Sequence, residues 1–587
     1  MARPHSFLYT LFAVSSLIVI LNAQNETRYN PAIPGWHSDP SCVFVPDWNE
    51  TTFCTSSTFL LTPGLPIHAS QDLVNWKLIS HALSRKNQYP AFDQSLAQTD
   101  GIWAATVRYH QGTFFIITMY KNNVEQLQTG LIFNTTDPYD NNAWNGPIRY
   151  ETEYIDPDLF WDDDGTAYVA TSGINLQTAD LTTGTFGESR SIWNGSTGVY
   201  LEGPHLYKKD GYYYILAAEG GSGINHTVII ARSKHIFGPY ENHSGNPVLT
   251  NKNTSRYFQN VGHADLFQDA LGHWWASALA WRSGPLAVTY PMGRETVLTP
   301  VTWNEGAWPI FSPICGIESG WYLPVAKENS CHGTCVGDAD IIDFEPGSPI
   351  PSHFGYWRWP VPDSYTISPS GHPGTLQLTP SPLSISAGYE NLTLGYQVDN
   401  LTLIMRLQTD TLFQYSVDVF FTPEIEHEEV GVTLYLNQVQ NMALGVIMLP
   451  ISTTTNLTTN PTLAPHLRFV VSGLGGLEKN IPKPFVTPVP DSWLKDPIRL
   501  FVRAENETHY TFTAASSSSP YEIIPMGIAP ATIVSGGTGD FTGSLVGAYA
   551  TTNGRNGSSP AYISRWRYQG LAQAVGNQEY IPSRFNY

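Results

Sequence analysis

Basic side chains are scarce in this chain of 587 residues, in which 30 lysines and arginines stand against 50 aspartates and glutamates. The formal net charge of -20 argues against a nucleic-acid partner, because phosphate binding needs a basic face. Charged residues make up only 14% of the chain, and aromatic residues make up 13%. Such a balance is typical of strand-rich folds and of surfaces that stack on sugars, although core packing alone could account for most of it. The composition fits a secreted protein that acts on a neutral polymer.

Long apolar segments are absent from the sequence after its first 23 residues. The apolar run from Phe7 to Leu21 follows Arg3 and precedes a plausible cleavage point after Ala23, which predicts a secretory signal peptide over residues 1–23. A membrane anchor is the alternative, but the run is short and is interrupted by two serines. No later stretch is long and apolar enough to span a bilayer. We therefore expect a secreted, extracellular protein with no membrane partner.

Sequons for N-linked glycosylation support secretion. Any single Asn-x-Ser/Thr could arise by chance, but a dozen in one chain is a density that cytosolic proteins rarely show. We therefore expect a glycoprotein. The sequons begin at Asn25, Asn49, Asn134, Asn194, Asn225, Asn242, Asn253, Asn391, Asn400, Asn456, Asn506 and Asn556.

The chain has only five cysteines. In an oxidising compartment Cys42 and Cys54 could staple the first hairpin, and Cys331 or Cys335 could pair with Cys315. The odd count leaves at least one thiol unpaired. A Cys-x-x-x-Cys without matching histidines is poor evidence for zinc, so we predict no metal at that motif.

Amphipathic helices of convincing length are lacking in the first half, where a turn followed by an aromatic-rich strand recurs instead. In two cases an aspartate precedes the turn glycine, Asp164 and Asp210, as tight hairpins prefer. The intervals of about 45 to 65 residues match a four-stranded propeller blade. We therefore predict a five-bladed β-propeller over residues 24–335. The repeated hairpins lie at residues 49–53, 112–117, 165–169, 211–215 and 272–276.

The second half contains several strand-like segments, and its apolar residues show no helical period. A turn-rich linker with three prolines spans residues 346–351, and a serine-rich loop is expected at residues 516–520. Several strands of this kind predict a β-sandwich over residues 336–587, and so an all-β protein of two domains. The predicted strands include Leu412 to Phe421, Val430 to Leu436, Leu467 to Val471 and Ile498 to Val502.

Three carboxylates lie in settings suited to sugar chemistry. Asp39 precedes the first predicted hairpin, Asp156 the third and Glu202 the fourth, so strands entering near a propeller axis would bring all three to one mouth. Cleaving a glycosidic bond needs one carboxylic acid to protonate the leaving oxygen and another carboxylate on the sugar's opposite side. A third carboxylate can keep the pKa of the acid high, because like charges close together resist joint ionisation.

Each of these acids also has a purely structural interpretation. Asp39 before Pro40 could simply begin a turn, and on its own that would be the better interpretation. Asp156 lies near an acidic run at residues 162–164 that could be a solvated hairpin. Glu202, before Gly203 and a proline, has the least obvious structural purpose.

In combination, the motifs around these acids resemble glycoside hydrolase family 43, in a fungal-type form, over roughly Asn30 to Val325. The tail resembles the concanavalin-like, jelly-roll type sandwich of that family's β-xylosidases and related α-L-arabinofuranosidases. The resemblance rests on Asp39-Pro40-Ser41, Gly101-Ile102-Trp103-Ala104, Asp156-Pro157-Asp158-Leu159-Phe160, Glu202-Gly203-Pro204, Gly262-His263 and Gly293-Arg294-Glu295-Thr296.

The resemblance implies inversion at the anomeric carbon, with a role for each acid. Asp39 would be the general base that activates water, Glu202 the general acid, and Asp156 the residue that raises the pKa of the acid and orients it. The family often has proline at the position of Ser38 and usually at that of Ala105, and both departures lie close to the expected site.

The resemblance also implies four substrate-binding residues, Trp103, Arg294, His263 and Phe541. Arg294 would hydrogen-bond sugar hydroxyls, for which guanidinium geometry is well suited. His263 matches an axial histidine that in some members helps to hold calcium through water, and it could equally be a hydrogen-bonded core residue. Phe541 resembles a sandwich-loop residue that reaches across to the propeller; the alternative is that it packs in the sandwich core.

The function predicted from these resemblances is an exo-acting hydrolase that removes single pentoses from plant cell-wall arabinoxylan or its oligosaccharides. β-D-xylosidase is the first candidate and α-L-arabinofuranosidase the second. An endo-arabinanase is less favoured, because it would need an open cleft, whereas the extra domain suggests a pocket closed at one end. A non-catalytic carbohydrate-binding protein is also less favoured, because a lectin has no need for a general acid beside a general base. We expect no required cofactor, with a structural calcium ion left open, and the sequence does not predict an oligomeric state.

Overall fold

The computed structural model describes residues 24–25, 27–95, 99–123, 125–325, 335–386, 401–451, 462–473, 480–537 and 541–583. The predicted signal peptide, Cys331 and the sequons at Asn391, Asn400 and Asn456 lie outside these residues. The predicted all-β class is confirmed, since helical structure in the described residues is limited to short 3-10 helices. These are η1 (Lys86–Gln88), η2 (Pro90–Gln94), η3 (Ser172–Ile174), η4 (Pro362–Ser364), η6 (Asp491–Trp493) and η7 (Ala531–Val534). None of the described helices has the length and apolar character that a membrane crossing requires.

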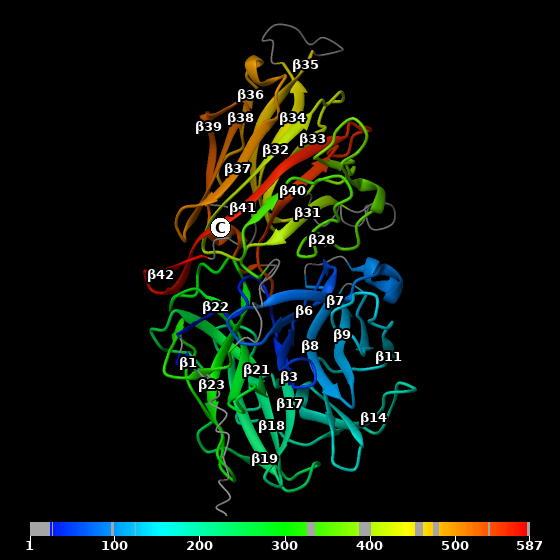
Figure 1. Ribbon diagram of the computed structural model, residues 1–587, viewed down its shortest axis with the longest axis vertical. Helices are drawn as coiled ribbons and strands as arrows, with labels where there is room; N and C mark the ends of the chain where they lie inside the picture. Colours follow the sequence, from blue (N-terminus) through cyan, green and yellow to red (C-terminus); the bar gives the residue numbers. More distant parts are fainter. Residues whose placement is uncertain are drawn as a thin grey trace, which may run out of the picture.

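The first half forms five antiparallel sheets that follow one another along the chain, which is the predicted five-bladed propeller (Figure 1). The first blade contains β3 (Ser41–Val45), β4 (Thr51–Thr55), β6 (Gly64–Ser70) and β7 (Lys77–Leu83). The second contains β8 (Gly101–His110), β9 (Thr113–Asn122), β10 (Leu127–Thr135) and β11 (Ile148–Tyr150). The third contains β12 (Asp158–Trp161), β13 (Ala167–Thr171), β14 (Asn175–Asp180), β15 (Thr185–Phe186) and β16 (Arg190–Ser191).

The last two blades complete the ring. The fourth contains β17 (Glu202–Lys209), β18 (Tyr212–Glu219), β19 (Thr227–Ser233) and β20 (Glu241–Asn242). The fifth contains β21 (Phe258–Gln268), β22 (Trp274–Arg282), β23 (Arg294–Thr302) and β24 (Ile310–Phe311). The beginning and the end of the propeller then meet, in the pairs β1 (Gln24–Asn25) with β26 (Tyr322–Leu323) and β2 (Arg28–Tyr29) with β25 (Ile317–Glu318).

The five predicted turns all join the first strand of a blade to its second strand. Gly211, between β17 and β18, shows why a glycine is favoured there. Its φ is 70°, in the left-handed region that side chains with a Cβ disfavour. The hairpin pattern in the sequence therefore marks the start of each blade.

A buried ion network ties the first strands of the blades together. The guanidinium of Arg108 on β8 lies 2.7 Å from both Asp158 on β12 and Asp265 on β21. The hydroxyl of Ser41 on β3 donates to Asp265 at 2.6 Å, and His205 on β17 contacts Arg108 at 3.1 Å. Because burial would otherwise favour neutral forms, these pairings hold the pKa of Asp265 well below its usual range. All five first strands are thereby fixed relative to one another.

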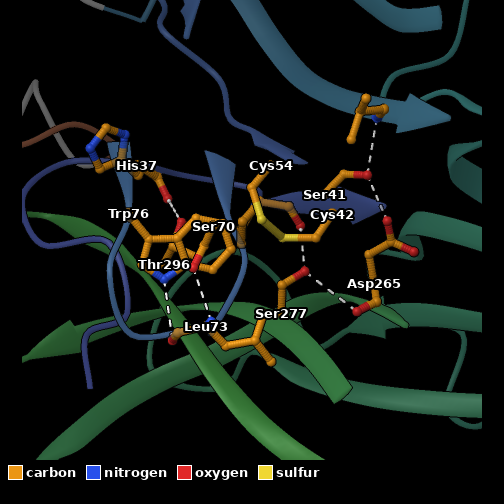
Figure 2. Close-up of a disulfide and its surroundings, with 12 residues drawn as sticks. His37, Ser41, Cys42, Cys54, Ser70, Leu73, Trp76, Asp265, Ser277 and Thr296 are labelled. Carbon is orange, nitrogen blue, oxygen red and sulfur yellow. Dashed lines mark hydrogen bonds between the residues drawn. A yellow bond between two sulfur atoms is a disulfide. The ribbon is translucent and has the colours of Figure 1, made fainter. Parts of the chain in front are cut away.

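Cys42 and Cys54 form the predicted disulfide between paired positions of β3 and β4 (Figure 2). Cys335 is also disulfide-bonded, whereas Cys315 keeps a free thiol. The predicted pairing of Cys315 was therefore wrong. Its thiol instead accepts a hydrogen bond from Arg256 at 2.8 Å.

The second half is a sandwich of two antiparallel sheets. One contains β27 (Asp340–Ile342), β29 (Tyr365–Ile367), β30 (Leu376–Leu378), β32 (Leu412–Phe421), β37 (Ile498–Ala504), β38 (His509–Ser516), β39 (Ser519–Pro530), β41 (Ala561–Gly576) and β42 (Glu579–Pro582). The other contains β5 (Leu61–Thr62), β28 (Gly355–Trp357), β31 (Thr402–Leu407), β33 (Glu429–Asn437), β34 (Gln440–Pro450), β35 (Leu463–Ser472), β36 (Phe485–Pro488) and β40 (Leu545–Thr551). The four strands predicted from the sequence lie in β32, β33, β35 and β37.

Two connections were also predicted in this half. Residues 346–351 lie between β27 and β28, outside the strands, as expected for a linker. The loop predicted at residues 516–520 is a tighter turn, because β38 continues to Ser516 and β39 begins at Ser519.

The sandwich lies against one side of the propeller (Figure 1), and the two domains are joined by a strand pairing and by apolar and polar contacts. β5 leaves the first blade and pairs with β28 in the sandwich. Trp359 packs 6.1 Å from Phe92 in the core of the first two blades. The guanidinium of Arg282 on β22 donates to Thr411 at 3.2 Å. The predicted division between residues 335 and 336 stays a prediction, since the preceding residues 326–334 are not among those described.

Candidate active site

Asp39 lies two residues before β3, the first strand of the first blade. Its φ of 51° turns the backbone sharply, and its side chain is only 8% exposed. The hydroxyl of Ser57 donates to Oδ2 at 2.5 Å, and the guanidinium of Arg294 lies 3.4 Å from Oδ1. A carboxylate held at both oxygens keeps one orientation, which a general base requires.

Glu202 is the first residue of β17, where the pairing with β18 is irregular between Glu202 and His205. Its side chain is 20% exposed, which makes it the most accessible of the three predicted acids. Burial raises the pKa of Glu202 to about 7; Arg294 opposes this shift and the charge of Asp39 adds to it. A carboxyl of this kind can hold a proton near neutral pH and still reach a ligand.

Asp156 precedes β12 and accepts a hydrogen bond at 3.1 Å from the backbone nitrogen of Gly203, the residue after Glu202. Burial raises the pKa of Asp156 well above its usual value, and the charges of Glu202 and Asp39 add to that shift. The three carboxyls thus lie close enough for their charges to act on one another. Because they resist joint ionisation, the group keeps a proton near neutral pH.

Arg294 begins β23 and lies between the propeller and the sandwich. Its guanidinium donates to the carbonyl of Ser222 at 2.9 Å, faces Asp39, and covers the ring of Phe541 at 4.7 Å. The preceding residue, Gly293, lies so close to the sandwich that a Cβ would be 2.2 Å from the carbonyl oxygen of Thr542. The backbone of the second domain therefore meets the propeller next to Arg294.

Phe541 lies in this contact and not in the sandwich core, so the alternative interpretation of it was wrong. Its ring stacks on Phe59 at 6.1 Å and meets Trp103 edge-on at 6.2 Å. The hydroxyl of Ser38 donates to the carbonyl of Phe541 at 2.7 Å. The structure thus brings Trp103, Arg294 and Phe541 together, and the serine that departs from the family pattern holds the loop that carries Phe541.

His263 on β21 faces the same oxygen of Asp39 as Arg294 does, with Nδ1 3.4 Å from Oδ1. Burial lowers its pKa to about 4, so the ring is neutral at neutral pH. Among the described residues, no group of three or more histidines, cysteines or acids is arranged to hold a metal ion. The neighbours of His263 also include the cationic Arg294. These side chains do not fit a calcium ion that they would ligate directly, so calcium held through water stays a prediction.

Three further residues touch the predicted site and were missed by sequence reasoning. Ser57 orients Asp39, the carbonyl of Ser222 holds Arg294, and Nδ1 of His226 lies 3.5 Å from Glu202. Ser57 follows β4, whereas the other two belong to the connection between β18 and β19. None carries a catalytic motif in the sequence, although His226 lies within the sequon that begins at Asn225. The only signal in the sequence was the glycine-rich segment at residues 220–223, which is followed by a histidine at position 226 that an exposed loop would not require.

Comparison with known proteins gives consistent results. Residues 29–309 match the model of glycosyl hydrolases family 43, and residues 342–569 match the beta xylosidase C-terminal concanavalin A-like domain. A non-reducing end alpha-L-arabinofuranosidase from Bacteroides ovatus, BoGH43B, is 32% identical over 91% of this chain and 93% of its own. A xylosidase/arabinosidase from Butyrivibrio fibrisolvens is 32% identical over 71% of this chain and 79% of its own.

A solved structure, Bacteroides ovatus Xyloglucan PUL GH43B, superimposes with a TM-score of 0.78 and 30% identity over 93% of this chain and all of that chain. Both domains are therefore covered by the likeness. These relatives are bacterial, so the predicted fungal type is not supported.

Proposed function

The chain belongs to glycosyl hydrolases family 43 and is an O-glycosyl hydrolase, and on that premise we propose a secreted, inverting exo-enzyme that releases single pentoses. Its substrates would be xylan, arabinoxylan or the derived oligosaccharides of plant cell walls. The apolar N-terminal run and the density of sequons support secretion.

The observation that carries this proposal is the state of Glu202, whose pKa of about 7 suits a general acid at neutral pH. In the proposed reaction Glu202 gives its proton to the glycosidic oxygen as that bond breaks. Asp39 takes a proton from a water that attacks the anomeric carbon from the opposite face. Asp156 orients Glu202 through the backbone of Gly203, and as a third carboxyl beside the acid it would help to keep the pKa of Glu202 high. Inversion requires the carboxyls of Asp39 and Glu202 to be about 6.5–9.5 Å apart, which we predict for this pair.

Exo action is supported by the aromatic residues beside Arg294. Phe541, Phe59 and Trp103 make a wall to which the sandwich contributes one ring. Such a wall would exclude water and leave room for a terminal sugar, while Arg294 and His263 would contact its hydroxyls. An endo-acting enzyme would need an open cleft in the same place.

Two pentoses remain as candidates for the released sugar. β-D-xylose was the first choice from the sequence, and the match of the second domain to a beta xylosidase C-terminal domain supports it. α-L-arabinofuranose is favoured by the arabinofuranosidase from Bacteroides ovatus, which resembles the chain through both domains. The two sugars present similar hydroxyls near the scissile bond, so one site can take either.

The test is product analysis with the purified full chain on arabinoxylan, xylobiose and p-nitrophenyl pentosides. The proposal expects a single monosaccharide as product, and proton NMR during the first turnovers should detect the inverted anomer. Release of long oligosaccharides would point to endo action. Binding without hydrolysis would point to a carbohydrate-binding protein.

A further inference from the structure

His226 is a buried histidine that none of the predicted roles uses. Its ring is 1% exposed, and Nδ1 donates to the carbonyl of Gly221 at 2.8 Å. Because a carbonyl can only accept, the proton of the neutral ring lies on Nδ1. Burial lowers the pKa of His226 to about 3, so the ring is neutral at neutral pH. Nε2 has no hydrogen-bond partner among the described residues.

The ring fills a space that the chain keeps free for it. A Cβ on Gly262 of β21 would lie 1.7 Å from the imidazole carbon Cδ2, so only glycine fits beside it. Gly262 directly precedes His263, which contacts Asp39. On its other side, His226 lies 3.5 Å from the carboxylate of Glu202. The imidazole of His226 thus contacts two parts of the site. One is β21, which carries the neighbour of Asp39, and the other is the side chain of Glu202.

The segment of residues 220–226, here called the clamp loop, closes on this ring. The backbone nitrogen of His226 donates to Gly223 at 2.8 Å, and that of Gly220 donates to Val199 at 2.9 Å. The bond from the ring to Gly221 closes the loop a second time. The next residue after Gly221 is Ser222, whose carbonyl accepts from Arg294 at 2.9 Å. The conformation fixed at Gly221 therefore determines where the acceptor for Arg294 lies.

We propose that His226 is a positioning residue whose ring locks the clamp loop, so that the Ser222 carbonyl holds Arg294 against Asp39 and Phe541. This inference rests on the proposed function, in which Arg294 contacts the sugar. Without the imidazole, the carbonyl of Gly221 loses the hydrogen bond from Nδ1 of His226. The clamp loop can then turn the carbonyl of Ser222 away from Arg294. Arg294 would then keep its charge and lose its fixed direction.

The chain offers matched variants for a test. His226→Leu removes the donor and keeps an apolar side chain in the space, whereas His226→Asn places an amide N–H near the position of Nδ1. His81 is a suitable control, because it is also buried and has a pKa lowered to about 4, but it belongs to β7 of the first blade. His81→Leu controls for the loss of a buried imidazole as such.

Amide hydrogen exchange of the clamp loop, detected by mass spectrometry, tests the proposal without any substrate. His226→Leu should speed exchange of the amides in residues 220–226 by about tenfold, as expected for one lost hydrogen bond, and His226→Asn should restore protection. His81→Leu should leave these amides unchanged. Wild-type exchange in His226→Leu would overturn the lock, whether or not the chain hydrolyses pentosides.

A double-mutant cycle with Arg294→Lys tests how the lock acts. His226→Leu alone should lower kcat/KM for a p-nitrophenyl pentoside by about tenfold or more, and in the Arg294→Lys background by less than about threefold. Equal factors in both backgrounds would overturn action through Arg294. If the wild type releases no pentose, the proposed function fails, and the exchange experiment still decides whether His226 locks the loop.

Discussion

The hydroxyl of Ser38 donates a 2.7 Å hydrogen bond to the backbone carbonyl of Phe541, although the two residues belong to different domains. The same hydroxyl oxygen accepts from the indole nitrogen of Trp36 at 3.2 Å. Proline, which the family often has at this position, offers neither a donor nor an acceptor side chain. In this chain the serine holds the ring of Phe541 beside Arg294.

Replacing Ser38 by alanine should loosen that ring. We expect kcat/KM for pentosides to fall about three- to tenfold, mainly through KM, as the loss of one hydrogen bond predicts. Steady-state kinetics with Ser191→Ala as the control, an exposed serine of the third blade, would measure this. An unchanged KM would mean that the hydroxyl does not position Phe541.

Removing the aromatic ring itself should have a larger effect. Phe541→Ala deletes a stacking partner of Phe59 and the face that lies under the guanidinium of Arg294. KM for a terminal pentose should rise by at least about tenfold. Phe485→Ala, at an exposed position of β36, should leave KM as it is. Kinetics on xylobiose would decide, and equal behaviour of the two variants would remove Phe541 from the substrate site.

Glu202→Gln separates acid catalysis from positioning. The amide cannot donate the proton that a sugar leaving group needs, whereas an activated aryl leaving group needs little protonation. Activity on xylobiose should fall about 10²- to 10⁴-fold, and activity on activated aryl pentosides should fall much less. Equal losses on both substrate types would point to a positional role for Glu202.

Asp39→Asn should behave differently, because no leaving group replaces an activated water. Activity should fall by about 10²-fold or more on xylobiose and aryl pentosides alike. The amide can still contact Ser57 and Arg294, so the site should keep its shape. Comparing both substrates at saturation measures this. Retention of aryl pentoside hydrolysis would assign the base to another group.

The pH profile should carry the signature of Glu202. Its protonated form is the active one, so kcat/KM should decline above about pH 7, about tenfold for each further pH unit. In Glu202→Gln the residual hydrolysis of aryl pentosides should lose this alkaline decline. A wild-type profile that stays flat to pH 9 would contradict the assignment of Glu202 as the acid.

The local patterns in the sequence predicted the fold well, because each blade begins with a hairpin whose turn is chemically distinctive. Asp39, Asp156 and Glu202 could be placed for the same reason, since each precedes such a hairpin. His226 could not be predicted, because its role depends on the approach of Gly262 from another blade. The wrong pairing of Cys315 has a similar cause, because disulfide partners depend on how distant segments meet.

The short strand β5 has a consequence for how the molecule is made. It lies between two strands of the first blade, and its partner β28 is synthesised only after the whole propeller. The segment between β4 and β6 therefore stays unpaired until the second domain has been made, although the four strands of the first blade can pair before then. The two domains should then unfold as one cooperative unit, because separating them breaks a sheet as well as a surface.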